Sequence, residues 1–439
     1  MGKMPSPKPF GFHRDQKGGL RVDGIPLGDI ADTFGTPLFV YSADAITQAW
    51  QDLAAAFLKD NRRIHYAMKA NSNLAVLRLL QRLGAGVDIV SLGELKRALA
   101  VGFAGEDIIF SGVGKTKEEL QAAITAGIGQ INAESVSEID TIITLATKSK
   151  KPVPVAIRIN PNITAGGHAK IATGSGEAKF GIASDAVPAA YQHLHQCEAI
   201  KPMGLAIHIG SQVMEVKHFA SAWQHMLKLA ESLRTQGMAV PKLDLGGGIG
   251  VDYEKGTPSP IAEFAKTVDT IFAKHDYALC CEPGRYLVAH AGCLVTRVIR
   301  TKTNSDGKGF IVVDAAMNDF IRPTLYEAYH PILAITQPNI AMGDNVANAD
   351  IVGPICETGD YLGLNRPQSQ LVCAEGEYFA VMATGAYGAV MRSRYNSRPL
   401  ASEVMVIDGK AYAVSKPDSI EAMLAADIIP PPLVPAPAV

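Results

Sequence analysis

Eight short apolar runs, rich in β-branched residues, recur between residues 63 and 284 and are separated by helix-like stretches. The runs cover 63–70, 86–91, 107–112, 129–134, 155–160, 205–210, 242–248 and 278–284. Between them, stretches such as 74–83, 92–101, 117–126 and 219–236 are amphipathic and rich in Ala and Leu. Apolar strands that alternate with helices indicate a parallel sheet. Eight such units over about 250 residues favour a (β/α)8 barrel of the TIM type, with an open doubly wound sheet as the alternative.

The pattern changes after residue 290, where strand-like runs are divided by Gly, Asn, Asp and Pro. This texture predicts a second, mostly antiparallel β domain. The hairpin-like stretch GGLRVDGIPL near the start resembles this domain more than the barrel. We therefore predict a barrel over 36–285, a β domain built from 1–35 and 286–420, and a Pro-rich tail at 421–439 that is extended or disordered.

Composition excludes several classes of protein. The 439 residues carry a net charge of −2 without a basic block, so nucleic acid is not an expected partner. No apolar run approaches the ~18 residues of a membrane helix, and the first residues lack the apolar core of a secretory signal. None of the six cysteines forms a CxxC pair, so neither a metal site nor a disulfide framework is indicated. We expect reduced thiols and a cytoplasmic protein.

Reactive residue types gather where the predicted strands end. The carboxyl ends of barrel strands build the active sites of TIM-type enzymes. Lysine ends the first run here, and the other strand ends carry carboxylates, histidine and serine. These residues are Lys69, Asp88, His208, Ser211 and Glu282. A lone lysine that caps the sheet would explain one such ending but not several.

The GGGIG loop at 246–250 follows the seventh strand, a common place for phosphate in such barrels. A simple tight turn is the alternative. A phosphorylated ligand together with a buried lysine suggests pyridoxal phosphate (PLP), bound by Lys69 as an imine. Burial is expected to lower the pKa of Lys69, whereas a salt-bridged lysine is the ordinary alternative. Glu282 would pair with the pyridine nitrogen or form an ordinary salt bridge, and His208 would lie on the ring or be a hydrogen-bonded core histidine.

Seven motifs carry a resemblance to a known family over residues 10 to 420: YAMKAN, HIGSQ, LDLGGGIG, EPGRYLV, DAAMNDFIRPTLY, CETGDYL and ATGAYG. The chain resembles the PLP-dependent decarboxylases with an alanine-racemase-like barrel. YxxKAN and EPGR occur across several related amino acid decarboxylases. DAAMNDFIRPTLY together with CETGD is similar to the diaminopimelate decarboxylase family in particular.

The resemblance implies a role for each candidate residue. Lys69 and Cys356 would be catalytic, the first holding the cofactor and the second returning a proton as general acid. The implied cofactor contacts are Lys69, Asp88, His208, Ser211, Gly247, Gly248, Glu282, Gly284, Arg285 and Tyr387. The implied substrate contacts are Arg285, Arg322, Tyr326, Glu357 and Tyr387. From sequence alone, a buried core cysteine is the favoured interpretation of Cys356, and an exposed salt bridge is the alternative for Arg322.

The resemblance also implies decarboxylation of meso-2,6-diaminopimelate to L-lysine, the last step of lysine biosynthesis. CETGD would come from the partner subunit of a homodimer with shared active sites. The Gly-rich segment 160–182, with His168, resembles a flexible active-site loop, and a plain surface loop is its alternative. Four alternative functions stay open: a sister decarboxylase of ornithine or arginine, an alanine-racemase-like enzyme, a non-catalytic PLP carrier, and a phosphate-sugar barrel enzyme without PLP.

Overall fold

The computed structural model describes residues 11–163, 179–254, 256–336, 348–367 and 374–433, and these form two compact units. The barrel unit comprises 43–291 and 385–390. The β unit comprises 1–42, 292–384 and 391–439.

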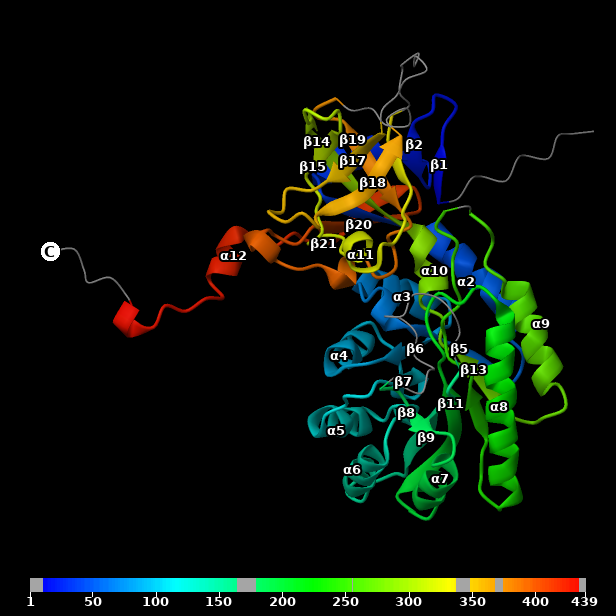
Figure 1. Ribbon diagram of the computed structural model, residues 1–439. Coiled ribbons are helices and arrows are strands. Elements are labelled where there is room, and N and C mark those ends of the chain that lie inside the picture. The colour runs from blue at the N-terminus through cyan, green and yellow to red at the C-terminus, as the bar shows by residue number, and fades with distance from the viewer. Residues whose placement is uncertain (1–10, 164–178, 255, 337–347, 368–373, 434–439) are drawn as a thin grey trace, which may run out of the picture. The chain divides into compact units, whose positions relative to one another are not determined.

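Eight parallel strands close the barrel unit (Figure 1). In order around the barrel they are β5 (Arg62–Ala67), β6 (Gly86–Ile89), β7 (Ile108–Phe110), β8 (Gln130–Ala133), β9 (Val153–Asn160), β11 (Ile200–Ile207), β12 (Lys242–Asp244) and β13 (Ala278–Cys281). β13 pairs with β5 and β8 pairs with β9, so the sheet has no open edge. The predicted (β/α)8 barrel is confirmed, and the open sheet is excluded. A two-residue strand, β10 (Ile182–Ala183), pairs with the end of β9.

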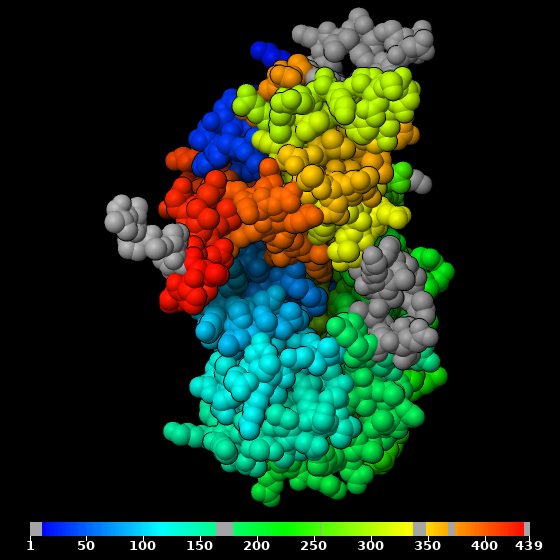
Figure 2. Space-filling view, turned by 60° about the vertical axis from the view of Figure 1, so that its left-hand side comes forward, coloured from blue at the N-terminus to red at the C-terminus, as the bar shows by residue number. Residues whose placement is uncertain are grey.

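Helices alternate with the barrel strands along the chain and cover them from outside (Figure 1). They are α2 (Ala43–Phe57), α3 (Leu74–Arg82), α4 (Leu92–Ala100), α5 (Lys117–Ala126), α6 (Val136–Ala146), α7 (Val187–His195), α8 (Val216–Thr235), α9 (Ile261–Phe272) and the short α10 (Arg285–Val288). Each buries one apolar stripe: α3, for example, buries Val76, Leu77 and Leu80. In the space-filling view, the cyan α4, α5 and α6 form the near surface of the barrel unit (Figure 2).

Side-chain caps begin several of the barrel helices. Asn73 accepts the Ala75 N–H at 2.9 Å and begins α3. Thr116 begins α5 with a capping box, in which its hydroxyl accepts the Glu119 N–H and the Glu119 carboxylate accepts the Thr116 N–H. These caps fix the loops that precede α3 and α5.

The β unit is built around a large mixed sheet. The order β18 (Tyr361–Pro367), β17 (Asn348–Val352), β15 (Gly309–Val313), β14 (Gly292–Thr303), β4 (Leu38–Ser42), β20 (Ser402–Ile407), β21 (Lys410–Ser415) forms its main path. β19 (Tyr378–Met382) pairs with β14 and with β16 (Ile332–Ala334). A small sheet of β1 (Phe12–Arg14), β2 (Leu20–Val22) and β3 (Ile25–Pro26) leads into α1 (Leu27–Phe34). Only β15–β17 and β4–β20 are parallel among the described pairs, so the mostly antiparallel prediction is confirmed.

β4 lies in the β unit, although the predicted barrel began at residue 36. Its backbone pairs antiparallel with β14 and parallel with β20, and its apolar side chains join the core of that sheet. Within the predicted tail, α12 (Ile420–Leu424) is a short helix whose Leu424 is 68% exposed (Figure 1).

Candidate active site

Lys69 lies on a single 3₁₀ turn, η1 (Met68–Ala70), directly after β5. Met68 and Ala70 on either side are fully buried, so the backbone of this turn is fixed by packing. Asn71, the residue after this turn, is also fixed, because its side chain donates to the Gly385 carbonyl at 3.0 Å. The strand end therefore presents Lys69 on a rigid support.

Asp88 at the end of β6 is the ionic partner of Lys69. The Lys69 Nζ lies 3.3 Å from Asp88 Oδ2, and the Asp88 side chain is fully buried while that of Lys69 is 35% exposed. Burial lowers the pKa of Lys69, but the charges of Asp88, Tyr387 and Glu282 raise it by more. The expectation of a lowered lysine pKa is therefore wrong for this structure, because these groups outweigh burial.

Glu282, beyond the end of β13, has a buried carboxyl group whose Oε1 has no hydrogen-bond donor among the described residues. Burial raises the pKa of Glu282, and the nearby Asp244 and Asp88 raise it further. Burial therefore disfavours the charged form of the Glu282 carboxyl group. The predicted alternative of an ordinary salt bridge is not found within the described chain.

His208 and the glycine loop meet at the end of β11. Gly247 donates its N–H to His208 Nδ1 at 3.1 Å, which makes Nδ1 an acceptor. Burial, and then Lys69 and Arg158, lower the pKa of His208, so the ring is neutral. A Cβ on Gly247 would overlap the Glu282 carbonyl oxygen, so only glycine lets the two chains approach this closely.

Arg285, at the start of α10, is 4% exposed and joins three elements of the barrel unit. It donates to the Tyr253 hydroxyl at 2.6 Å and to Ser211 Oγ at 2.9 Å. Its guanidinium lies 4.8 Å from the centre of the Tyr387 ring. Its Nε is buried without an acceptor in the described chain. The group is therefore held in place with one donor left over.

Tyr387 comes from a segment, 385–390, that is distant in sequence yet packs on the barrel. Its N–H donates to the Ala70 carbonyl at 2.8 Å, and its φ of 55° is left-handed. Gly284 approaches the same turn, because a Cβ there would lie 3.0 Å from that of Ala70. Lys69, Asp88, His208, Ser211, Gly247, Gly248, Glu282, Gly284, Arg285 and Tyr387 thus all belong to the barrel unit.

The other predicted site residues belong to the β unit. Arg322, at the start of α11 (Arg322–Tyr326), is 6% exposed, so the alternative of an exposed salt bridge is wrong. Its Nε donates to His330 Nε2 at 3.3 Å, and its guanidinium lies 5.6 Å from the Tyr326 ring centre.

Cys356 is exposed, so the core-cysteine interpretation favoured by sequence alone is also wrong. Its N–H donates to Asn396 Oδ1 at 3.0 Å. The neighbouring Glu357 is exposed and accepts a hydrogen bond from Tyr395. The segment therefore presents a thiol and a carboxylate at the surface of the β unit.

Comparison with known proteins identifies the family. Residues 43–289 match the family described as "Pyridoxal-dependent decarboxylase, pyridoxal binding domain". The chain is 42% identical to the diaminopimelate decarboxylase of Zymomonas mobilis, over 93% of this chain and 96% of the relative. This chain belongs to the diaminopimelate decarboxylase family.

Solved structures of this family show the same fold. The diaminopimelate decarboxylase of Helicobacter pylori, solved with L-lysine, has 36% identity and a TM-score of 0.85 over 91% of this chain and 98% of that chain. The enzyme of M. jannaschii, also with L-lysine, has 32% identity and a TM-score of 0.90 over 97% and 99%.

The barrel residues fit the PLP on which this family of pyridoxal-dependent decarboxylases relies. Glu282 offers a buried oxygen without a donor, which suits a protonated ring nitrogen. Arg285 keeps a buried donor, and the Gly247 backbone leaves no room for a side chain. A lysine amine beside these groups completes the set that a phosphorylated aldehyde requires.

Sequence reasoning missed Arg158, which points to the same end of the barrel from β9. Arg158 Nη1 donates to Glu134 Oε1 at 2.8 Å, and both side chains are nearly buried. The positive charge of Arg158 acts to lower the pKa of Lys69 and of His208. Strand alternation in VAIRIN, which sends Arg158 to the face opposite the flanking isoleucines, was a usable signal.

Two carboxyl groups of the barrel unit were also missed. Burial is the main cause that raises the pKa of Glu94, at the start of α4, to about 7, and the Asp88 charge adds to it. Asp244 ends β12 and is fully buried. The sequence did not mark Glu94 as a site residue, because a glutamate three residues after the N-cap Ser91 is typical of an ordinary helix start.

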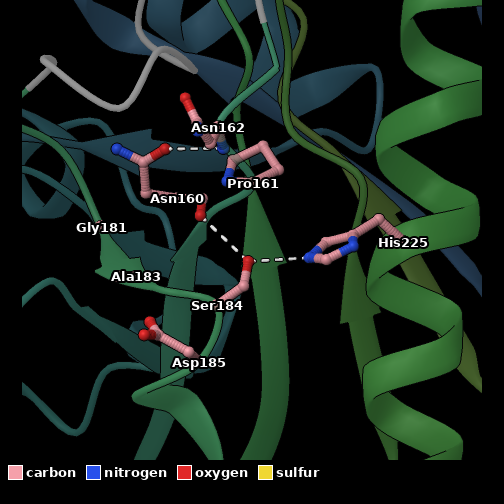
Figure 3. Close-up of a pocket in the computed structure, with 8 residues that line it drawn as sticks. All are labelled: Asn160, Pro161, Asn162, Gly181, Ala183, Ser184, Asp185 and His225. Carbon is pink, nitrogen blue, oxygen red and sulfur yellow. Dashed lines mark hydrogen bonds between the residues drawn. The ribbon is translucent and has the colours of Figure 1, made fainter.

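A cavity of about 450 Å³ lies beside the end of β9 (Figure 3). Ser184 Oγ donates to the Asn160 carbonyl at 3.1 Å and lies 2.7 Å from His225 Nε2 of α8. These contacts fasten α8 to β9 and the segment after β10. Of the predicted loop 160–182, residues 164–178, which include His168, lie outside the described residues.

In the described residues, no helix is both long and apolar enough to span a membrane.

Proposed function

We propose that this chain is a PLP-dependent enzyme that decarboxylates meso-2,6-diaminopimelate to L-lysine and CO2, the last step of lysine biosynthesis. The observation that carries the proposal is similarity to diaminopimelate decarboxylases over nearly the full length of both chains. The match includes both units, whereas a non-catalytic PLP carrier would need only the barrel. A phosphate-sugar enzyme would leave Lys69 without a role.

PLP, when bound, supplies an electron sink that accepts the electron pair left by the departing carboxylate. Lys69 would hold the cofactor covalently, and for this its amine must be neutral. Asp88 Oδ2, 3.3 Å away, stabilises the charged amine in this structure, so cofactor binding would have to release that proton. Burial raises the pKa of Asp88, which makes it a better base than an exposed aspartate.

The remaining barrel residues would fix the cofactor. Glu282 would keep the ring nitrogen protonated, and the neutral His208 would lie against the ring. The phosphate would be held at Ser211, Gly247, Gly248, Gly284 and Arg285, and Asp88 and Tyr387 would complete the contacts. Backbone N–H groups and an arginine fork are suitable partners for phosphate oxygens.

The substrate would be oriented by its charged ends. Arg285, Arg322 and Tyr326 would bind carboxylate, since a guanidinium meets a carboxylate bidentately. Glu357 would hold the distant ammonium group, and Tyr387 would contact both substrate and cofactor. A fixed carboxylate, with its bond perpendicular to the cofactor ring, selects decarboxylation over other cleavages at the same carbon. Cys356 would then donate the thiol proton to the carbon from which CO2 has left.

We further propose a cytoplasmic homodimer. Cys356 and Glu357 are exposed on the β unit, which is where residues that complete the site of a second copy would lie. Because a C2 dimer repeats every contact, each dimer would have two shared active sites.

The test is lysine formation from meso-diaminopimelate by purified protein with PLP, with ornithine and arginine assayed beside it. We expect lysine from the first substrate alone, because only that substrate offers a second carboxylate to the arginines. Turnover of ornithine or arginine instead would overturn the assignment and indicate a sister activity. A Lys69→Ala variant should abolish both turnover and the absorbance of covalently bound PLP.

A further inference from the structure

Asp244 ends β12, and Glu282 follows the end of the adjacent parallel strand β13. Asp244 is in register with Cys280, and Glu282 lies two residues beyond Cys280. The two chains stay side by side beyond the strands, because the Glu282 N–H donates to the Gly246 carbonyl at 2.8 Å. Their carboxyl groups are within hydrogen-bonding reach of each other.

Both carboxyl groups are buried, and each has one oxygen without a donor among the described residues. Asp244 is 0% exposed and Glu282 is 5% exposed. Asp244 Oδ1 accepts the Gly246 N–H at 3.0 Å, whereas Oδ2 has no donor in the described chain. Glu282 Oε1 also has none. Each carboxyl group therefore offers an unmatched acceptor, and two acceptors make a hydrogen bond only if a proton lies between them.

Among the described residues, Lys69 is the cation that acts on Glu282, and it already pairs with Asp88. Titratable groups that act on the pair are Lys69, Asp88, Cys280 and Cys281. Lys69 is engaged by Asp88, and burial raises the thiol pKa of both cysteines, so they stay neutral. Two like charges in contact in a buried site cannot both be ionised at neutral pH, so the pair carries about one charge.

We propose that Asp244 is a positioning residue that shares one proton with Glu282 and thereby fixes the ionisation of Glu282 toward the PLP nitrogen. The inference rests on the role proposed above for Glu282. With the proton on Asp244, its O–H donates to one oxygen of Glu282. The other oxygen stays an acceptor for the protonated ring nitrogen. No proton is gained or lost by the pair in this arrangement.

The experiment compares holoenzyme variants Asp244→Asn and Asp244→Ala by the absorbance of bound PLP against pH and by the PLP dissociation constant. Asparagine keeps an N–H donor toward Glu282 that does not titrate. We expect the wild-type spectrum to change at alkaline pH, where the shared proton is lost, and Asp244→Asn to keep its neutral-pH spectrum there. Asp244→Ala should raise the PLP dissociation constant on the order of tenfold and alter the spectrum at neutral pH.

Glu138→Gln is the matched control, because Glu138 is a nearly buried carboxylate of the same barrel that pairs with Lys115. It should leave the PLP spectrum unchanged. A wild-type spectrum and affinity in Asp244→Ala, or equal losses in the Asn and Ala variants, would overturn the inference.

Glu282→Gln separates this inference from the proposed function. A changed spectrum in Glu282→Gln with no effect of the Asp244 variants rejects only the shared proton. An unchanged spectrum in Glu282→Gln rejects the role of Glu282 itself.

Discussion

At the scale of single residues, the candidate site is a balance of buried charges around one lysine. Asp88, Asp244 and Glu282 supply carboxyl groups, and Lys69 and Arg158 supply the nearest positive charges. A residue's behaviour here depends on its neighbours more than on its own burial, and Lys69 illustrates this because burial alone would have shifted its pKa downward.

Cys356→Ala tests the proposed general acid. We expect turnover to fall on the order of 100-fold, since a positioned general acid contributes about that much or more. Absorbance of bound PLP should be unchanged, because Cys356 is not among the proposed cofactor contacts. Steady-state kinetics and absorbance measure the two effects. Cys197→Ala, outside the candidate site, is the control, and undiminished turnover in Cys356→Ala would reject the acid role.

Glu94→Gln tests the raised pKa of Glu94. A carboxyl whose folded pKa is about 7 binds its proton more tightly folded than unfolded, where the pKa is 4.5. Its contribution to stability is therefore complete below pH 4.5 and is lost as the pH rises through 7. Gln accepts the same Val90 N–H without titrating.

We expect the free energy of unfolding of the PLP-free wild type to fall relative to Glu94→Gln over this interval, by up to about 3 kcal/mol. Urea unfolding at a series of pH values measures the difference. Curves that run parallel for the two proteins would contradict the pKa shift.

At the scale of elements, the strand-to-helix loops are held by caps that also connect neighbouring helices. Glu119 accepts the Thr116 N–H at 3.0 Å and, with its other oxygen, the Leu92 N–H at 2.8 Å. One carboxylate thus fastens the starts of both α5 and α4.

Glu119→Ala should lower the free energy of unfolding by about 1–2 kcal/mol, because two helix starts lose an acceptor. The pKa of Glu119 is lowered, and the largest cause is the hydrogen bond from the Thr116 backbone N–H. The loss should therefore be full at neutral pH and shrink as the pH falls below the ordinary carboxyl range. Chemical denaturation measures it. Glu118→Ala, in the same first turn, is the control, and an equal loss there would reject the special role of Glu119.

The elements could largely be predicted from sequence, and the reasons are local. Apolar runs between amphipathic stretches identified all eight barrel strands, and the structure brings Lys69, Asp88 and Glu282, which lie at strand ends, into one candidate site. β4 was placed in the wrong unit, because LFVYS has the composition of a buried strand in either sheet. Glu94 and Asp244 acquire their environment from contacts with residues distant in sequence, which a single sequence does not display.

At the scale of the whole molecule, the proposed shared sites give a test by complementation. Lys69→Ala and Cys356→Ala subunits should each be inactive or nearly so alone. Mixed after dissociation, they should regain about one quarter of wild-type activity, since half of the dimers are mixed and each has one intact site. Activity assays with size measurement check this. No recovery despite mixed dimers would show that both residues act within one subunit.

The path of β4 has a consequence for how this chain is made. β4 hydrogen-bonds to strands that begin at residues 292 and 402. The neighbouring strands of this sheet are therefore separated in sequence by most of the polypeptide. A nascent chain emerging from the ribosome must therefore keep β4 unpaired while the whole barrel is synthesised. In sequence, the barrel is an insertion within the β unit. All eight barrel strands are therefore synthesised, and can pair, before the last strands of the β sheet are made.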